Sequence, residues 1–347
     1  GGVGGVMSFF PLIFVMFLFI STLEDTGYIA RVAFILDRVL QTFGLQGKSI
    51  LAMIVSGGLG AGGCAVPGVM ATRTLREDKD RLITMLVAPF MNCGAKMPVY
   101  AMLIAAFFAN SRTAMMLLLW AISWAVALCA AWTLRRFVIR GEQTPFIMEL
   151  PPYHIPVMRG VFQHTWERTW MYIKKAGTII LAINVVLWAL MYFPRLDAPV
   201  SDDPEEQAAQ ELAHSFAGRL GRGLEPITKL TGFDWRTNIA LIGGFAAKEV
   251  VIGTLGTAYS MGEIDPEQSE SLSERLKNDP EWYPLKAFAL MIFVMIYAPC
   301  LVTIAVIRRE SGSWKWALFA TAYSTAIAFV LAALIFQIGG LLGLGNA

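Results

Sequence analysis

The chain has 347 residues, of which 56% are apolar and 16% are charged, and its mean hydropathy is +0.56. An ordinary soluble domain is about 45–50% apolar and about 25% charged, so this composition excludes a purely soluble protein. The net charge of +2 comes from 28 basic and 26 acidic residues, and so balanced a charge gives no reason to expect a nucleic-acid partner.

Five runs without any Asp, Glu, Lys or Arg are long enough to cross a membrane as helices. A 20-residue helix rises about 1.5 Å per residue and covers the roughly 30 Å hydrocarbon core of a bilayer. The predicted spans are residues 6–23, 113–134, 176–193, 287–307 and 316–338. The sequence therefore predicts an all-α, polytopic integral membrane protein. Residues 27–43 are less apolar and fit either a short broken span or a helix that lies in the membrane interface.

Three further apolar stretches are interrupted by helix-breaking residues. Residues 49–72 and 237–262 are rich in glycine, and residues 82–108 contain Pro89 and Pro98. Irregular backbone at membrane depth is tolerated only where it is buried in protein or lines a wet cavity. We therefore expect broken or re-entrant helices around a permeation site.

The charges in the connecting segments predict an orientation. Residues 135–175 hold seven Lys or Arg against three acidic residues, which favours a cytoplasmic linker of amphipathic helices. Residues 195–236 carry eight acidic and five basic residues, and residues 263–286 carry seven and three, so both are predicted to be external insertions.

The two halves of the chain repeat the same order of elements. The sharpest correspondence joins residues 88–93, Ala-Pro-Phe-Met-Asn-Cys, to residues 298–300, Ala-Pro-Cys. Paired helix breaks at equivalent positions of two repeats point to a transport site near the membrane midplane. The predicted divisions are a first gate-type repeat (1–134), the linker (135–175) and a second gate-type repeat (176–347) that includes both insertions.

Three of the four cysteines lie beside helix breaks, which makes them candidate metal ligands. They are Cys64, Cys93 and Cys300, whereas Cys129 lies in an unbroken span. Thiolate and thioether sulfur bind Fe²⁺, Zn²⁺ and Cu⁺, whereas Mg²⁺ and Ca²⁺ prefer oxygen. The alternative is that such cysteines are small apolar fillers. No CxxC pair or histidine pair fixes a tight, closed site, which suits passage of an ion better than its storage.

Other candidate ligands are weaker, except for one intramembrane carboxylate. Glu249 interrupts the second glycine-rich stretch, where a charge is costly, and its neighbour Lys248 is either its partner or a snorkelling group. The weaker candidates are Met70, Met91, Met97, Asn92, Glu24 and Asp25.

Residues 44–49, Gly-Leu-Gln-Gly-Lys-Ser, end like a phosphate-binding loop. Thr42 replaces the first glycine of the GxxxxGK[ST] pattern, and no predicted strand precedes it, so nucleotide binding is not expected there. No nucleophile, histidine and acid are placed together either, so the chain is not predicted to be an enzyme and has no catalytic residues.

Several stretches closely resemble the membrane domain of the bacterial ferrous iron transport protein B family. They include LEDTGYIARVAFILDR, GGCAVPGVMATRT, DRLITMLVAPFMNCGAKMPVY, GFAAKEVVIGTLGT and YAPCLVTIAVIRRESGSWKWA, and the likeness runs in order from Gly1 to about Gly340. In that family the cysteines of three such motifs are proposed to line the iron route, and here they fall on Cys64, Cys93 and Cys300.

The resemblance implies the rest of the expected setting. It implies Fe²⁺ as the transported substrate, a bacterial inner membrane, and control by an amino-terminal GTPase domain. We expect this chain to be a fragment without that domain, so that it has no cofactor itself and GTP and Mg²⁺ act only through the missing part. The expected partners are the lipid bilayer, the GTPase domain, small cytoplasmic accessory proteins and further copies of the chain.

The sequence thus predicts the permease part of an Fe²⁺ importer. Fe²⁺ would enter past the acidic outer segments and shed water against cysteines, backbone carbonyls and Glu249. Two alternatives are a transporter of nucleosides or other organic solutes that shares the gate modules, and a membrane scaffold without transport.

Overall fold

The computed structural model describes residues 10–11, 14–15, 17–19, 21–23, 25–58, 63–75, 77–139, 153, 156–194, 210–259 and 270–343. Within these residues the regular elements are helices, as predicted. A helix satisfies its own backbone hydrogen bonds, which is what apolar surroundings require.

Short helices separated by breaks make up most of the first half, and one long helix, α7, follows them. The elements are α2 (Tyr28–Thr42), α3 (Ser49–Met53), the π-helical turn η1 (Ile54–Gly58), α4 (Ala65–Ala71), η2 (Thr72–Thr74), α5 (Asp78–Val87), η3 (Ala88–Phe90), η4 (Gly94–Lys96), α6 (Met97–Phe107), η5 (Ala109–Ser111), α7 (Arg112–Thr133) and η6 (Leu134–Val138).

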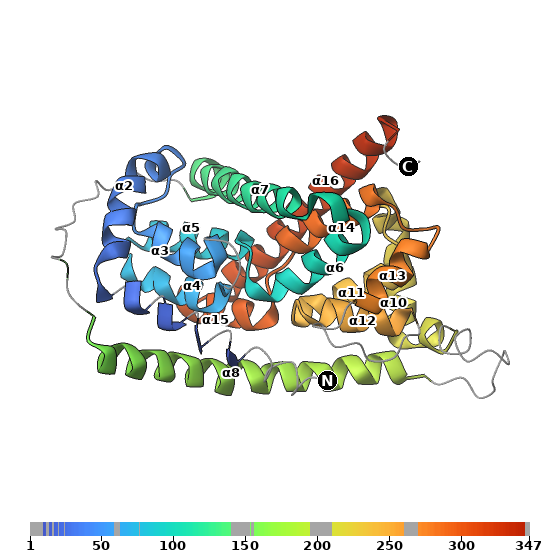
Figure 1. Cartoon of the computed structure of the whole chain (residues 1–347), viewed down its shortest axis with the longest axis horizontal. Coiled ribbons are helices and arrows are strands. Elements are labelled where there is room, and N and C mark those ends of the chain that lie inside the picture. Colours follow the sequence, from blue (N-terminus) through green and yellow to red (C-terminus); the bar gives the residue numbers. More distant parts are fainter. Residues whose placement is uncertain are drawn as a thin grey trace.

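The second half contains longer helices. They are α8 (Met158–Tyr192), α10 (Phe216–Thr228), η7 (Lys229–Thr231), α11 (Trp235–Ala246), α12 (Val250–Ala258), α13 (Glu270–Asn278), α14 (Pro284–Ile296), α15 (Leu301–Ser311) and α16 (Trp314–Leu341). Figure 1 shows α8 along one side of the molecule, with α2 to α5 above one of its ends and α10 to α13 above the other.

Three helical stretches of the described residues are long and apolar enough to cross a membrane. They are Ala109–Val138, Pro284–Ser311 and Trp314–Leu341, and they confirm the predicted spans 113–134, 287–307 and 316–338. The stretch 284–311 is the inner one. Of its most apolar 18 residues, 78% are buried in protein, compared with 28% and 22% for the other two stretches. The first and third stretches leave apolar side chains for lipid to cover.

Small residues on α16 allow it to pack closely on the central helix α14 and on α15, which follows it. The buried positions of α16 include Ala317, Ala320, Ser324 and Ala328, which recur every three or four residues. Such a stripe lets two membrane helices approach closely and gain dispersion contacts. The central helix is thereby fixed, and it leads directly into one of the breaks described below.

Several predicted elements differ in detail from the structure. Residues 27–43 form one unbroken helix, α2, while the span 287–307 is interrupted between α14 and α15. Helix α8 runs without interruption through the predicted boundary between the linker (135–175) and the second repeat, because no proline stands between Val157 and Phe193. The predicted span 6–23 is described only in part, and its described residues from 10 to 23 are helical.

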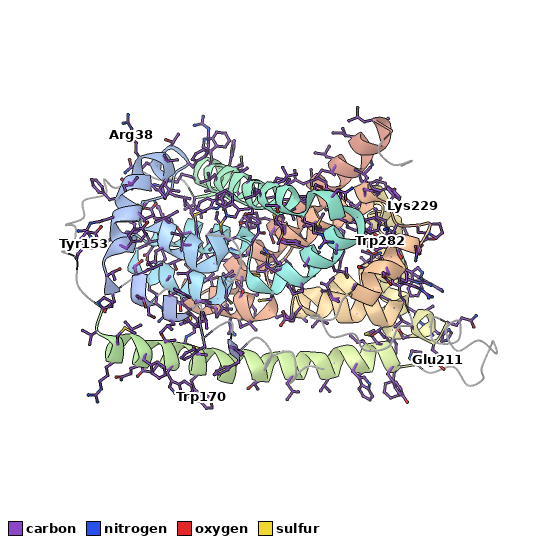
Figure 2. The ribbon with its side chains drawn as sticks, viewed as in Figure 1. Arg38, Tyr153, Trp170, Glu211, Lys229 and Trp282 are labelled. Atoms are coloured by element: carbon purple, nitrogen blue, oxygen red, sulfur yellow. The ribbon has the colours of Figure 1, made fainter. Side chains whose placement is uncertain are left out.

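The predicted outer insertion 263–286 contains a packed helix. Leu272 and Leu276 of α13 are fully buried, and α13 lies against α6. Trp282 stacks on Phe107 of α6 with ring centroids 6.2 Å apart. Figure 2 shows Trp282 at the end of the molecule where α10 to α13 lie. Trp170 lies on α8, and its side chain is exposed, as expected for an interfacial anchor.

Candidate functional site at the helix breaks

The two breaks of the first half are joined through their backbones. Gly63 and Cys93 form a parallel β-bridge, in which the N–H of Gly94 donates to the carbonyl of Gly63 at 2.8 Å. The N–H of Cys64 donates to the carbonyl of Val55 at 2.9 Å. The main chains around Cys64 and Cys93 are therefore held in a fixed relationship.

Two glycines make this close approach possible. A Cβ atom on Gly57 would lie 2.1 Å from the carbonyl oxygen of Asn92, and one on Gly63 would lie 2.0 Å from the nitrogen of Gly57. Gly57 also has φ = 122°, a conformation that L side chains rarely adopt. Glycine is required at both positions by geometry.

Side chains from α7 and α6 hold the same breaks from the outside. The indole N–H groups of Trp120 and Trp124 both donate to the carbonyl of Gly58, each at 2.9 Å. The amide of Asn92 donates to the carbonyl of Leu119 at 3.4 Å and accepts from the hydroxyl of Tyr100 at 3.2 Å. Asn92, predicted as a weaker metal ligand, is buried, and both ends of its amide make hydrogen bonds.

The breaks of the second half bring Cys300 to the neighbourhood of Cys64. Cys300 lies between α14 and α15, and its sulfur is hydrogen-bonded to the hydroxyl of Thr303 at 3.1 Å. A small apolar cluster then joins Cys300 to Val66, which is two residues after Cys64; its members are Val66, Ala247, Val250, Cys300 and Val302. Helix α4 of the first half therefore packs on α15 and on the break between α11 and α12.

The three cysteines share one structural position. Cys64, Cys93 and Cys300 each occupy the N-cap of the helical segment that follows a break, namely α4, η4 and α15, and each has extended backbone angles. All three are free and half-buried. Gly63, the neighbour of Cys64, is bridged to Cys93, and Val66, two residues after Cys64, lies in one apolar cluster with Cys300. The breaks thus place three sulfur atoms from both halves in one region.

Glu249 contributes a carboxylate to the same region. It lies at the N-cap of α12, is half-buried, and directly precedes Val250, which belongs to the same apolar cluster as Cys300. The breaks thus carry thiols and a carboxylate, which are donor types that a borderline metal ion accepts. Within the described residues, no group of three or more His, Cys, Asp or Glu side chains is close enough together to hold an ion.

Two buried lysines lie among these breaks, and sequence reasoning did not find what they do. The ammonium of Lys96 donates to the carbonyls of Pro89 (3.1 Å), Met91 (2.9 Å) and Met295 (2.7 Å). The ammonium of Lys248 donates to the carbonyl of Ala298 at 2.8 Å and lies 2.9 Å from the centre of the Tyr297 ring. Lys248 is therefore buried rather than snorkelling to the surface, and its ammonium contacts Ala298 and Tyr297.

The remaining predicted ligands have varied surroundings. Met91 is in the buried core, Met97 packs against that core, and Met70 is half-buried. Asp25 accepts a hydrogen bond from the N–H of Val157, the N-cap of α8, at 3.1 Å. Glu24 lies outside the described residues. Cys129 is exposed on α7, in agreement with its predicted place on a plain span.

The stretch 44–49 is a tight connection between α2 and α3. The N–H of Gly47, which would face a phosphate in a nucleotide loop, donates instead to Asp37 at 2.6 Å. The hydroxyl of Ser49 is buried and bonded to that of Thr84 at 2.8 Å. These contacts attach the connection to Asp37 of α2 and Thr84 of α5.

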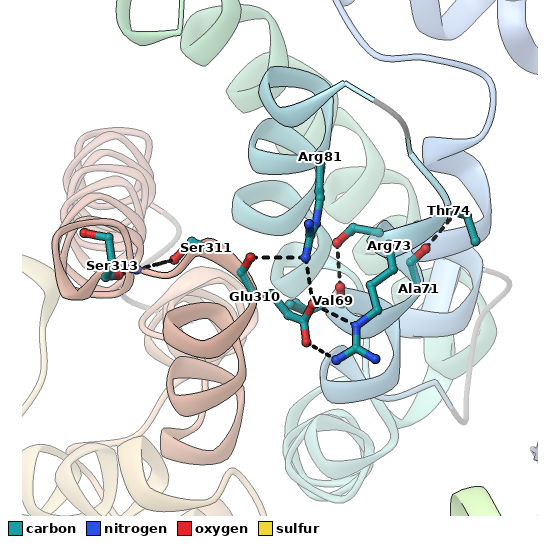
Figure 3. A network of polar contacts seen from close by, with 9 residues as sticks. Val69, Ala71, Arg73, Thr74, Arg81, Glu310, Ser311 and Ser313 are labelled. Carbon is teal, nitrogen blue, oxygen red and sulfur yellow. Dashed lines mark hydrogen bonds and ion pairs between the residues drawn. The ribbon is translucent and has the colours of Figure 1, made fainter.

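Helix α15 connects the candidate site to an ionic network at its other end. Glu310, near the end of α15, accepts hydrogen bonds from Arg73 Nε and from Arg81 Nη2, both at 2.8 Å. Figure 3 shows both guanidinium groups meeting the Glu310 carboxylate from the first half of the chain. The side chain of Glu310 is 4% exposed, whereas that of Arg73 is 51% exposed. One helix thus carries Cys300 at its start and this network at its end.

Comparison with known families assigns the chain to one of them. A family model described as "Gate: Nucleoside recognition" matches residues 6–107 and 173–314, which together make up more than half of the chain. A second one, described as "Ferrous iron transport protein B C terminus", matches residues 116–168. The chain belongs to the ferrous iron transport protein B family. It corresponds to the carboxy-terminal membrane part of that family.

Similar curated proteins carry iron-transport names. A fusion protein of Porphyromonas gingivalis, "Fe(2+) transport protein A/Fe(2+) transporter FeoB", is 40% identical over 98% of this chain and 43% of its own length. The Fe(2+) transporter FeoB of Methanocaldococcus jannaschii is 40% identical over 98% of this chain and 49% of its own. That of Campylobacter jejuni is 40% identical over 95% and 53%.

The chain spans about half the length of these ferrous iron transport protein B relatives. No solved structure matches it significantly. The family and the three long apolar helices together identify a multi-pass protein of the inner membrane. The two-repeat organisation and the residue boundaries of its parts stay predictions.

Proposed function

We propose that this chain is the permease part of a ferrous iron importer and that Fe²⁺ passes between the helix breaks. The observation that carries the proposal is that Cys64, Cys93 and Cys300, from both halves of the chain, all lie at the N-caps of segments that follow breaks. Half-buried sulfur suits an ion that must bind and then leave.

The surrounding hydrogen bonds narrow the choice of ligands. Five carbonyls at the breaks already accept hydrogen bonds from Trp120, Trp124, Lys96 or Lys248; they belong to Gly58, Pro89, Met91, Met295 and Ala298. The groups best able to replace the water shell of Fe²⁺ are then the thiols and the carboxylate of Glu249. Acidic residues of the predicted outer segments would raise the local cation concentration.

Substitution of the cysteines tests the proposal. We expect Cys64→Ser, Cys93→Ser and Cys300→Ser to lower Fe²⁺ uptake by the intact protein, measured anaerobically under reducing conditions in cells or liposomes. Cys129→Ser is the matched control, because Cys129 is exposed on α7. Uptake equal to that of the unsubstituted protein in all three variants would contradict the thiol route.

A second candidate is the transport of nucleosides or similar organic solutes, because the description of the Gate family names nucleoside recognition. The two candidates differ in what stabilises the purified protein. We expect Fe²⁺ or Co²⁺ under reducing conditions to raise the unfolding temperature and nucleosides to leave it unchanged. The reverse result would favour the organic solute.

Control by GTP is part of the proposed function. The curated relatives are about twice as long as this chain, which leaves room for a GTPase domain in the intact protein. The fusion protein of P. gingivalis joins an Fe(2+) transport protein A to its transporter, which supports a small accessory protein as a partner. We expect GTP, but not GDP, to increase Fe²⁺ uptake. Cross-linking in membranes would show whether several copies of the chain associate.

A further inference from the structure

Lys96 and Lys248 hold the same turn of the chain from two sides. The turn runs from Met295 to Ala298 and directly precedes Pro299 and Cys300. Lys96 donates to its first carbonyl and Lys248 to its last, while the ring of Tyr297 lies under the Lys248 ammonium. Both lysines are almost fully buried, at 2% and 3% exposed.

The partners of Lys96 define its charge. Three carbonyl oxygens surround its nitrogen, and an ammonium has three N–H donors whereas a neutral amine has two. Three acceptors are therefore satisfied only by the charged form. The partners of Lys248, a carbonyl oxygen and the face of an aromatic ring, likewise attract a cation.

These two positive charges are close to the candidate ligands. Lys96 lies three residues after Cys93, while Lys248 directly precedes Glu249 and donates to the carbonyl of Ala298, two residues before Cys300. A divalent cation between the breaks would be repelled by both ammoniums. That repulsion is offset for an ion that forms bonds with thiolate sulfur, and it is not offset for one that needs oxygen ligands.

We propose that Lys96 and Lys248 are specificity-determining residues that exclude hard divalent cations such as Mg²⁺ and Ca²⁺ from the route. They act in two ways. They occupy carbonyl oxygens that such ions would need, and they place positive charge beside thiols that such ions bind poorly. Excluding competitors by repulsion is a general means of specificity. This inference rests on the proposed transport of Fe²⁺. It adds a reason why more abundant divalent cations are not transported along the same route.

The test compares charge removal with charge retention. Lys96→Gln and Lys248→Gln keep N–H donors without the charge, whereas Lys96→Arg and Lys248→Arg keep the charge. Proteoliposomes containing the intact protein are assayed for Fe²⁺ uptake with increasing external Mg²⁺ or Ca²⁺. We expect the Mg²⁺ concentration that halves Fe²⁺ uptake to fall at least about tenfold in the Gln variants and to stay unchanged in the Arg variants.

Lys286 provides the matched control. It is also a buried lysine, 3% exposed, but its ammonium lies 3.5 Å from Asp234 and 4.8 Å from the centre of the Trp282 ring. Lys286→Gln should therefore leave competition by Mg²⁺ unchanged. A lower tolerance of Mg²⁺ in Lys286→Gln as well would show a general loss of integrity and overturn the assignment.

A binding measurement tests the inference without any measurement of transport. The thiolate-to-metal absorption of Co²⁺ bound to the solubilised protein is titrated with Mg²⁺, and we expect displacement in the Gln variants alone. Unchanged competition in those variants overturns the inference. Equal loss of Fe²⁺ uptake in the Gln and the Arg variants overturns it too, since the lysines would then serve to position the breaks. Failure of the unsubstituted protein to take up Fe²⁺ would count against the proposed function instead.

Discussion

The carboxylate of Glu310 accepts a hydrogen bond of 2.8 Å from Arg73, a residue 237 positions earlier in the chain. Arg81 binds the same carboxylate and also the main-chain carbonyl of Glu310. The end of α15 is therefore attached to the first half of the chain, while the start of α15 carries Cys300.

Glu310→Gln tests this attachment. The amide has one acceptor oxygen and no charge, and Arg81, which is 27% exposed, would lose a charged partner. We expect the free energy of unfolding to fall by about 1–3 kcal/mol, measured by denaturant unfolding in detergent. Arg309→Gln, at an exposed neighbouring position, is the control and should have little effect. Equal stability of Glu310→Gln and the unsubstituted protein would mean that solvent screens the network.

Gly57→Ala should disrupt the joined breaks of the first half. The added Cβ would lie 2.1 Å from the carbonyl oxygen of Asn92, at a backbone φ of 122°. We expect a loss of about 2–4 kcal/mol in unfolding free energy, together with lower metal uptake. Gly223→Ala on α10 is the control, because nothing lies within 4 Å of its Cβ position, and it should stabilise the protein slightly. Normal uptake by Gly57→Ala would show that the close approach is dispensable.

Trp120→Phe and Trp124→Phe test whether the two indoles can replace each other as hydrogen-bond donors to Gly58. Each N–H donates to the carbonyl of Gly58, so either variant leaves that carbonyl one donor. We expect each single change to cost about 1 kcal/mol and the double change to cost more than their sum, measured by unfolding in detergent. Trp132→Phe, at an exposed position of α7, is the control. Strict additivity would argue that the two N–H groups act independently.

Asp80→Asn should expose the cost of breaking a buried ion pair. Arg135 Nη1 lies 2.7 Å from Asp80 Oδ1, and the side chains are 10% and 4% exposed. Removal of one partner leaves the other charge buried and uncompensated, which we expect to cost about 3–5 kcal/mol of unfolding free energy. Exposed Arg136, changed to Met, is the control. An unchanged unfolding temperature in Asp80→Asn would mean that water replaces the lost partner.

Sequence reasoning succeeded where the signal was local. Pro89, Pro299 and the glycines near Cys64 mark breaks because of their own backbone chemistry, and the adjacent cysteines could be picked out beside them. Charge-free runs predicted the helical stretches of α7, α14–α15 and α16 for the same reason.

What could not be predicted depends on distant backbone atoms. Met295, which binds Lys96, is 199 residues away in sequence, and its acceptor is a main-chain carbonyl that any residue provides. The same holds for the indoles of Trp120 and Trp124, whose acceptor belongs to Gly58. The sequence predicts a boundary within α8 because Lys175 is the last charged residue before an apolar run. Helix formation depends on backbone conformation, so α8 continues past that residue.

The bridge between Gly63 and Cys93 separates the spacing of the candidate site from its chemistry. Peptide groups determine how far apart the main chains of these two loops lie, whatever side chains they bear. Replacing a sulfur ligand by oxygen or nitrogen would then change which ions are attracted while the frame keeps its dimensions. Such a scaffold could be retuned for a different cargo one side chain at a time.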